Sequence, residues 1–136
     1  MDREELKKYL PHREPMLLID EIYMEDDGTV RAYYTVRGDE FFLQGHYPGH
    51  PVVPGVIQCE IMGQASSLLV LSALEGHTPF YTGIDSARFK HQIVPGDKME
   101  IRTKLIKSRG MMFFTEASIY VGETLCSKAS LSFMLK

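Results

Sequence analysis

A histidine and a glutamate that could together move protons lie in and just after a proline-rich segment in the middle of the chain. His46 lies near the start of this segment and Glu60 follows it. A neutral imidazole, with an ordinary pKa of about 6.5, is available as a base at physiological pH. Glutamate is rarely buried without a partner, and burial raises the pKa of its carboxyl group. If both side chains share one site, they predict acid–base catalysis. The alternatives are a loop histidine bonded to the backbone and a carboxylate near the positive start of a helix.

The proline-rich segment, from Gly45 to Gly55, contains His46 and three prolines. Proline fixes the backbone angle φ and restricts the preceding residue to extended geometry, so a stiff, non-helical loop is predicted. This loop ends where a helix begins, and the first N–H groups of a helix lack intrahelical partners and carry positive potential. Gly55 has no side chain and would let a substrate carbonyl approach these groups.

Residues Gly55 to Leu74 predict a helix about 30 Å long that is apolar on nearly all sides and therefore buried. A membrane span is disfavoured, because Gln58, Glu60 and Gln64 fall in the first half and no polybasic segment follows. Gln64 lies one turn after Glu60 on the same face, where it can hydrogen-bond the carboxyl group.

Composition limits the class of protein. The 136 residues are 44% apolar and 24% charged, which suits one globular domain, and the net charge of −3 argues against non-specific nucleic-acid binding. Cys59 and Cys126 lack disulfide or zinc spacing. His46 and His50 are four residues apart, but Pro48 prevents the helical geometry that would align them, so no metal site is predicted. The charged N-terminus does not resemble a signal peptide, and a cytoplasmic location is expected.

The remaining segments predict one short helix and antiparallel strands. The helix is expected over residues 2–10, capped by Asp2 and ended by Pro11. Turn residues separate strands expected at 15–26, 29–37, 80–93, 98–108, 111–121 and 124–135. A helix that is apolar on most sides needs a sheet curled around it. Because some apolar surface or a sheet edge would still be exposed, we expect a two-fold symmetric dimer.

Three motifs are spread over most of the chain. The central one is GHYPGHPVVPGV at 45–56, followed by Glu60 and Gln64. The N-terminal one is LPHR at 10–13 with Pro15 and Asp20, and the third comprises GID at 83–85, ARFK at 87–90 and VPGD at 94–97. Together they resemble the FabZ-type 3-hydroxyacyl-[acyl-carrier-protein] dehydratases of bacterial fatty-acid synthesis. The resemblance implies an α+β hotdog fold, a curved antiparallel sheet around one long central helix, in a single domain over 1–136.

The resemblance also implies the reaction, in which a 3-hydroxyacyl thioester loses water to give the trans-2-enoyl thioester. His46 would be the base, and Glu60 of the other protomer would be the acid or hold a water. The Gly55 N–H would polarise the thioester carbonyl. The implied catalytic unit is a homodimer, with a hexamer built as a trimer of dimers as the larger alternative. No metal or cofactor is implied, since the substrate rides on the phosphopantetheine arm of acyl carrier protein.

Further residues are assigned more loosely. Arg88 and Lys90 share a strand face and would meet the carrier or the phosphate of its arm, or else form a solvated face. Phe80, Tyr81 and Phe89 would line an acyl tunnel or belong to the core, Gln64 is a candidate contact, and His12 and His77 are expected to be surface or capping residues. Departures from the family pattern at Tyr47, Gln58, Cys59, Gly63, His91 and Gln92 predict an altered tunnel shape.

Two other functions fit parts of the pattern. A hotdog acyl thioesterase shares the fold and the helix N-terminal donor, but the His46 and Glu60 pair favours the dehydratase. Glutamate at position 60, where a related group carries aspartate and adds double-bond isomerisation, favours dehydration alone. A non-catalytic hotdog module that binds acyl carriers would not need either side chain.

Overall fold

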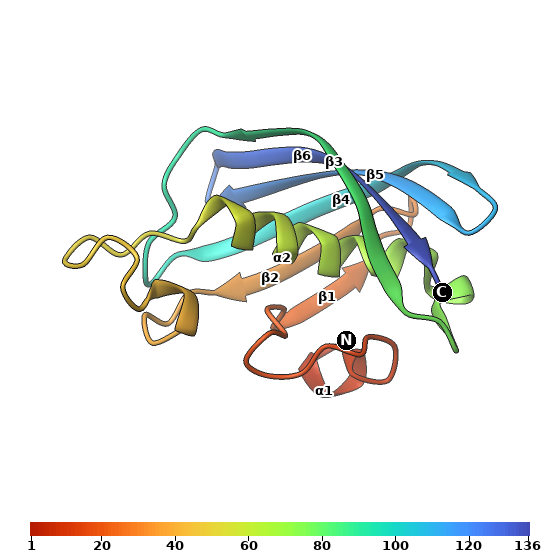
Figure 1. Cartoon of the computed structure of the whole chain (residues 1–136), viewed down its shortest axis with the longest axis horizontal. Coiled ribbons are helices and arrows are strands. Elements are labelled where there is room, and N and C mark those ends of the chain that lie inside the picture. Colours follow the sequence, from red (N-terminus) through yellow and green to blue (C-terminus); the bar gives the residue numbers. More distant parts are fainter.

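A six-stranded antiparallel sheet curves around one central helix in the computed structural model, which describes residues 1–136 (Figure 1). The strand order is β1-β2-β4-β5-β6-β3. The strands are β1 (Glu21–Met24), β2 (Val30–Thr35), β3 (Pro79–Phe89), β4 (Lys98–Arg109), β5 (Met112–Val121) and β6 (Thr124–Leu135). The helical elements are α1 (Arg3–Leu6), η1 (Phe41–Leu43), α2 (Gly55–Ser67), η2 (Leu68–Val70) and α3 (Leu71–Leu74). The predicted α+β class and element order are confirmed.

The central helix is held on the sheet by apolar packing and by a small buried group of hydroxyls. Ile61, Met62 and Ala65 are fully buried within the single core. Ser66 Oγ lies 2.8 Å from Thr103 Oγ1 and accepts a hydrogen bond from Thr115 at 3.2 Å, so these polar atoms are satisfied inside the core. The stretch Gly55–Leu74 is long and apolar enough to cross a membrane, but over half of it is buried in this fold.

Several predicted elements are shorter than expected. The strand expected at 80–93 ends at Phe89, so Lys90 lies beyond it and does not share a strand face with Arg88. The helix at the N-terminus ends at Leu6, although Asp2 caps it as predicted by accepting the N–H of Glu5 at 2.9 Å. The strand expected from residue 15 begins only at Glu21. The N–H of Leu17 bonds within a turn and the N–H of Leu18 bonds the side chain of Gln64, so neither is available to a neighbouring strand.

The central helix is also less regular than predicted. It is α-helical to Ser67, passes through the 3₁₀ turn η2 and resumes as α3. The strand β3 is irregular near Gly83, because its pairing with β6 shifts register on both sides of this residue.

The edge strand β3 carries much of the uncovered apolar surface. Phe80, Ile84 and Phe89 on this strand are about half exposed, and Val56 on α2 is 78% exposed. Contiguous apolar surface beside an unpaired sheet edge favours contact with another chain. The dimer remains a prediction, and this edge is where we expect it to form.

Candidate active site

His46 is held by the proline loop in a form suited to act as a base. Its Nδ1 lies 2.8 Å from the carbonyl oxygen of Val52. A carbonyl can only accept, so Nδ1 carries the proton in the neutral ring, and Nε2 keeps a free lone pair. The ring of the neighbouring Tyr47 lies tilted against the imidazole with ring centroids 4.4 Å apart, and Tyr47 has a backbone φ of 52°. Non-glycine residues with positive φ are uncommon and cluster at functional sites.

The start of α2 lies beside His46 and presents free donors. Pro54 is the cap position and offers no side-chain acceptor, and the N–H groups of Gly55 and Val56 are not used within the chain. His46 and Gly55 line one cavity of about 350 Å³ together with Phe89 and Lys90. A free base and a free helix N-terminal donor therefore face the same space.

The missing side chain of Gly55 has a different consequence from the one predicted. A Cβ at this position would lie 2.9–3.2 Å from three atoms of the Phe89 ring. Glycine at position 55 lets the Phe89 ring pack against the first turn of α2, and it also leaves the backbone N–H accessible.

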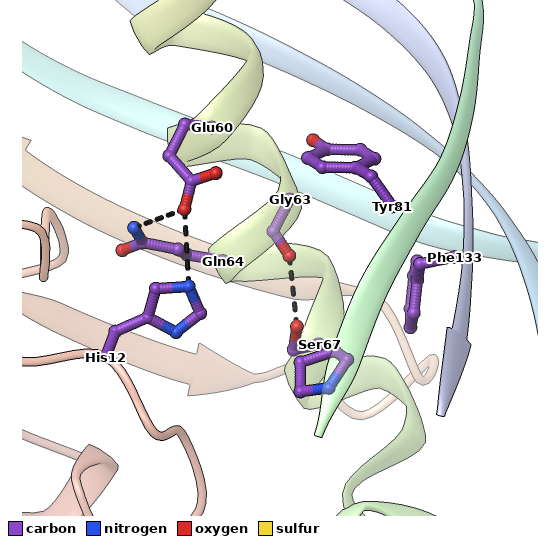
Figure 2. A pocket seen from close by; sticks show the side chains of 8 residues that line it. His12, Glu60, Gly63, Gln64, Ser67, Tyr81 and Phe133 are labelled. Atoms are coloured by element: carbon purple, nitrogen blue, oxygen red, sulfur yellow. Dashed lines mark hydrogen bonds and ion pairs between the residues drawn. The ribbon is translucent and has the colours of Figure 1, made fainter. Parts of the chain in front are cut away.

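Glu60 lies on another side of the helix, in a smaller cavity of about 50 Å³ (Figure 2). Its Oε2 accepts a hydrogen bond from Gln64 Nε2 at 2.8 Å, as predicted from their spacing, and lies 3.3 Å from His12 Nε2. The other lining residues come from α2, the β3 strand and β6: Gly63, Ser67, Pro79, Tyr81 and Phe133.

The expectation that burial leaves Glu60 with a raised pKa is wrong for this protomer. Burial is the largest single influence and does push the pKa upward, but the hydrogen bonds from His12 and Gln64 outweigh it, and the pKa lies below the ordinary glutamate value. The carboxyl group of the isolated protomer is therefore ionised at neutral pH.

His12 was not expected at the site, because it lies far from Glu60 in the sequence. Its side chain is 23% exposed and faces Glu60, and its Nδ1 is buried without a partner. The LPHR motif that contains it was the only sequence signal. His77, in contrast, lies exposed beyond α3, where its N–H bonds the carbonyl of Leu74, in agreement with a capping role.

The side-chain amide of Gln64 is engaged in hydrogen bonds within the protomer. Its Nε2 donates to Glu60 and to the carbonyl of Met16, and its Oε1 accepts the N–H of Leu18 at 2.9 Å. Both amide hydrogens are therefore engaged. The side chain ties the N-terminal segment, and with it His12, to the face of α2 that carries Glu60.

Replacing His12 with alanine is expected to raise the pKa of Glu60. Burial would remain, while the larger of the two opposing hydrogen bonds would be lost. The group would then titrate at higher pH, which carboxyl-carbon NMR of the folded protein would measure directly. Because a lowered folded-state pKa stabilises the fold above the unfolded value, the variant should also lose less stability as pH falls.

Glu40 provides the control for that titration. It is buried, and it accepts hydrogen bonds from the Tyr34 hydroxyl at 2.7 Å and the Arg37 N–H at 2.9 Å. These bonds and that of Gly38 lower its pKa against the opposing effect of burial. Its titration should not move in His12→Ala; a Glu60 resonance that also stays fixed would contradict the pairing with His12.

Beside Glu60, the Tyr81 phenol fills the space that a side chain on Gly63 would need. The Tyr81 hydroxyl donates to the carbonyl of Cys59, and a Cβ on Gly63 would clash with that hydroxyl oxygen and lie 2.7 Å from Cζ. Burial, together with the nearby Glu60 charge, raises the pKa of Tyr81, so the phenol is neutral.

Because of this contact, we expect the change in unfolding free energy caused by Gly63→Ala to have opposite signs with and without the Tyr81 ring. In the wild-type background alanine should destabilise by about 1–3 kcal/mol, because the phenol must leave its place. In a Tyr81→Ala background the same change should stabilise by about 1 kcal/mol through helix propensity. Urea unfolding of the four proteins measures both values. The same sign in both backgrounds would show that the two residues do not interact.

The predicted site residues fall into three groups. His46, Gly55, Phe89 and Lys90 share the larger cavity, and Glu60, Gln64 and Tyr81 share the smaller one. Phe80 and Arg88 are exposed and line neither. His46 and Glu60 thus face separate cavities of one protomer.

Comparison with known proteins places the chain in a family. The FabA-like domain matches residues 10–130. The 3-hydroxyacyl-[acyl-carrier-protein] dehydratase FabZ of Clostridium perfringens is 42% identical over 130 residues, 93% of this chain and 94% of that protein. The protein of the same name from Pelotomaculum thermopropionicum is 40% identical over 139 aligned positions, 100% of this chain and 99% of the relative.

Solved structures confirm the hotdog fold. The dehydratase heterocomplex ApeI:P from Xenorhabdus doucetiae gives a TM-score of 0.81 at 22% identity, covering 96% of this chain and 90% of that one. A hypothetical thioesterase with coenzyme A from Streptococcus pneumoniae gives 0.67 at 19%, covering 85% and 84%. Since the fold hosts both activities, the sequence relatives decide between them. The chain therefore belongs to the FabA-like family and, within it, to the FabZ-type 3-hydroxyacyl-[acyl-carrier-protein] dehydratases, which are hydro-lyases.

Proposed function

We propose that the protein dehydrates 3-hydroxyacyl-[acyl-carrier-protein] to the trans-2-enoyl thioester in fatty-acid synthesis. The observation that carries the mechanism is the placement of a free His46 Nε2 and a free Gly55 N–H on one cavity. Nε2 removes the proton next to the thioester carbonyl, and the Gly55 N–H stabilises the negative charge that grows on the carbonyl oxygen. The C–O bond at the third carbon then breaks and the hydroxyl leaves as water.

Glu60 of the partner protomer acts on the departing hydroxyl in this proposal. His46 and Glu60 line separate cavities of one chain, and this supports a site that combines His46 of one chain with Glu60 of the other. Glu60 is ionised in the isolated protomer. Cover by the partner and by substrate would remove water from the carboxyl group, and this stronger desolvation would raise its pKa towards that of a proton donor. The acid delivers its proton directly or through a held water.

The carrier protein and the assembly are part of the same proposal. Lys90 lies at the mouth of the His46 cavity, Arg88 is exposed on the strand before it, and neither forms an ion pair within the protomer. They are free to meet the phosphopantetheine phosphate. The homodimer is the catalytic unit, a trimer of such dimers is the larger assembly compatible with it, and the cytoplasm is its location. Neither a metal nor a cofactor enters these steps.

One assay tests the function against its two rivals. The enoyl thioester is supplied, and the loss of its conjugated ultraviolet absorbance is followed beside the release of free thiol. Hydration without thiol release supports the dehydratase run in reverse. Thiol release would identify a thioesterase. Binding of the thioester with neither reaction would identify a non-catalytic module and overturn the proposal.

A further inference from the structure

We propose that the Tyr81 side chain limits the length of the acyl chain that the enzyme accepts, and that Gly63 is glycine in order to admit it. This inference rests on the proposed function, because it uses Glu60 as the group that meets the substrate hydroxyl. In that arrangement the third carbon of the substrate lies at Glu60. The remainder of the acyl chain then has to continue past Glu60, along the cavity that this residue lines.

The cavity past Glu60 is small. Its volume is about 50 Å³, against about 350 Å³ for the cavity beside His46. A water-sized group needs roughly 10–15 Å³ of cavity volume, so the cavity past Glu60 holds about four heavy atoms. Ser67, Pro79 and Phe133 also line it. A long acyl chain exceeds this volume unless a lining side chain is made smaller.

Tyr81 is the wall that takes up the most space next to α2. Figure 2 shows its ring reaching from β3 towards the helix, beside Gly63. The hydroxyl is fixed by its bond to the Cys59 carbonyl, and only the absence of a Cβ on Gly63 leaves room for it. A ring that is bonded to the helix backbone cannot swing aside as easily as a free side chain. We therefore assign the size limit to the volume of the ring, with the hydroxyl as its anchor.

The test compares 3-hydroxyacyl pantetheine thioesters with four, eight and twelve carbons. The wild-type enzyme should prefer the four-carbon substrate over the twelve-carbon one by about 10-fold or more in kcat/KM, since one methylene in an apolar pocket already changes kcat/KM by about 10- to 200-fold. In Tyr81→Ala this preference should shrink by about 10-fold through a gain on the long substrate. Tyr81→Phe keeps the ring and should keep the preference.

Tyr23→Ala is the matched control, because Tyr23 is an exposed tyrosine on β1, the opposite edge strand of the sheet. Its profile should equal that of the wild type. An unchanged preference in Tyr81→Ala, no preference in the wild type, or an equal shift in Tyr81→Phe would each overturn the assignment to ring volume.

A binding measurement separates failure of this inference from failure of the proposed function. Affinities of unreactive saturated acyl pantetheine thioesters are measured by calorimetry for the same variants. If no protein turns over substrate but affinity falls with chain length only when Tyr81 is present, the size limit is supported and the proposed dehydratase function is wrong. If turnover occurs and neither readout depends on Tyr81, the proposed function is supported and the size limit is wrong.

Discussion

Mixing the His46→Ala and Glu60→Gln proteins, each inactive alone, is expected to restore about one quarter of wild-type activity. Loss of a positioned acid or base typically lowers the catalytic rate about 100- to 10,000-fold, so either variant alone should be nearly inactive. Random re-association of a two-fold dimer makes about half of all dimers mixed. One of the two sites in a mixed dimer then holds an intact His46 from one chain and an intact Glu60 from the other.

The expectation follows from the separation of the two cavities. Within one protomer, His46 is fixed by the Val52 carbonyl beside Gly55, while Glu60 is fixed by Gln64 and His12 on another side of the helix. Both variants should fold, because glutamine at position 60 can still accept the hydrogen bond from Gln64. Activity after dissociation and re-association is the measurement, with subunit exchange verified by native mass spectrometry.

A mixture of His46→Ala with His46→Gln is the matched control, and it should recover nothing, because every site then lacks the base. Exchange without any recovery in the His46→Ala and Glu60→Gln mixture would show that both residues act within one chain. The two-chain site would then have to be abandoned.

Local features of the site could be predicted from the sequence, whereas contacts between distant segments could not. The spacing of Glu60 and Gln64 fixes their hydrogen bond, since residues four apart on a helix are neighbours. The prolines fix the loop that carries His46. The approach of His12 depends on Gln64 bonding Met16 and Leu18, which join the N-terminal segment to the helix across more than 40 residues.

The sequence also did not predict why positions 55 and 63 carry glycine. Gly55 and Gly63 both lie in α2, in a backbone conformation that alanine would also adopt. Their neighbours, Phe89 and Tyr81, come from the single strand β3, which crosses the helix only in the folded chain. The apolar run at Leu17–Ile19 was predicted as strand because its distant packing partners could not be seen in the sequence either. Its burial comes from tertiary packing and not from strand pairing.

Gly55→Pro is expected to lower kcat/KM by about 100- to 1,000-fold relative to Gly55→Ala while leaving the fold intact. Proline removes the N–H that we assign to the thioester carbonyl, and losing one such donor costs about this much. Gly55 is the first residue of α2, a position that proline favours because its N–H has no helical partner. Pro54 already has φ −58° and ψ 143°, the extended geometry required before a proline.

Gly55→Ala supplies the control for steric effects. Both substitutions add a Cβ that would lie 2.9–3.2 Å from the Phe89 ring, but only proline also removes the donor. The difference between the two variants therefore isolates the contribution of the N–H. Steady-state kinetics on the enoyl thioester, with circular dichroism to verify folding, provides the measurement. If a folded Gly55→Pro protein were as active as Gly55→Ala, the carbonyl would have to be polarised by another group, and the free N–H of Val56 would be the next candidate.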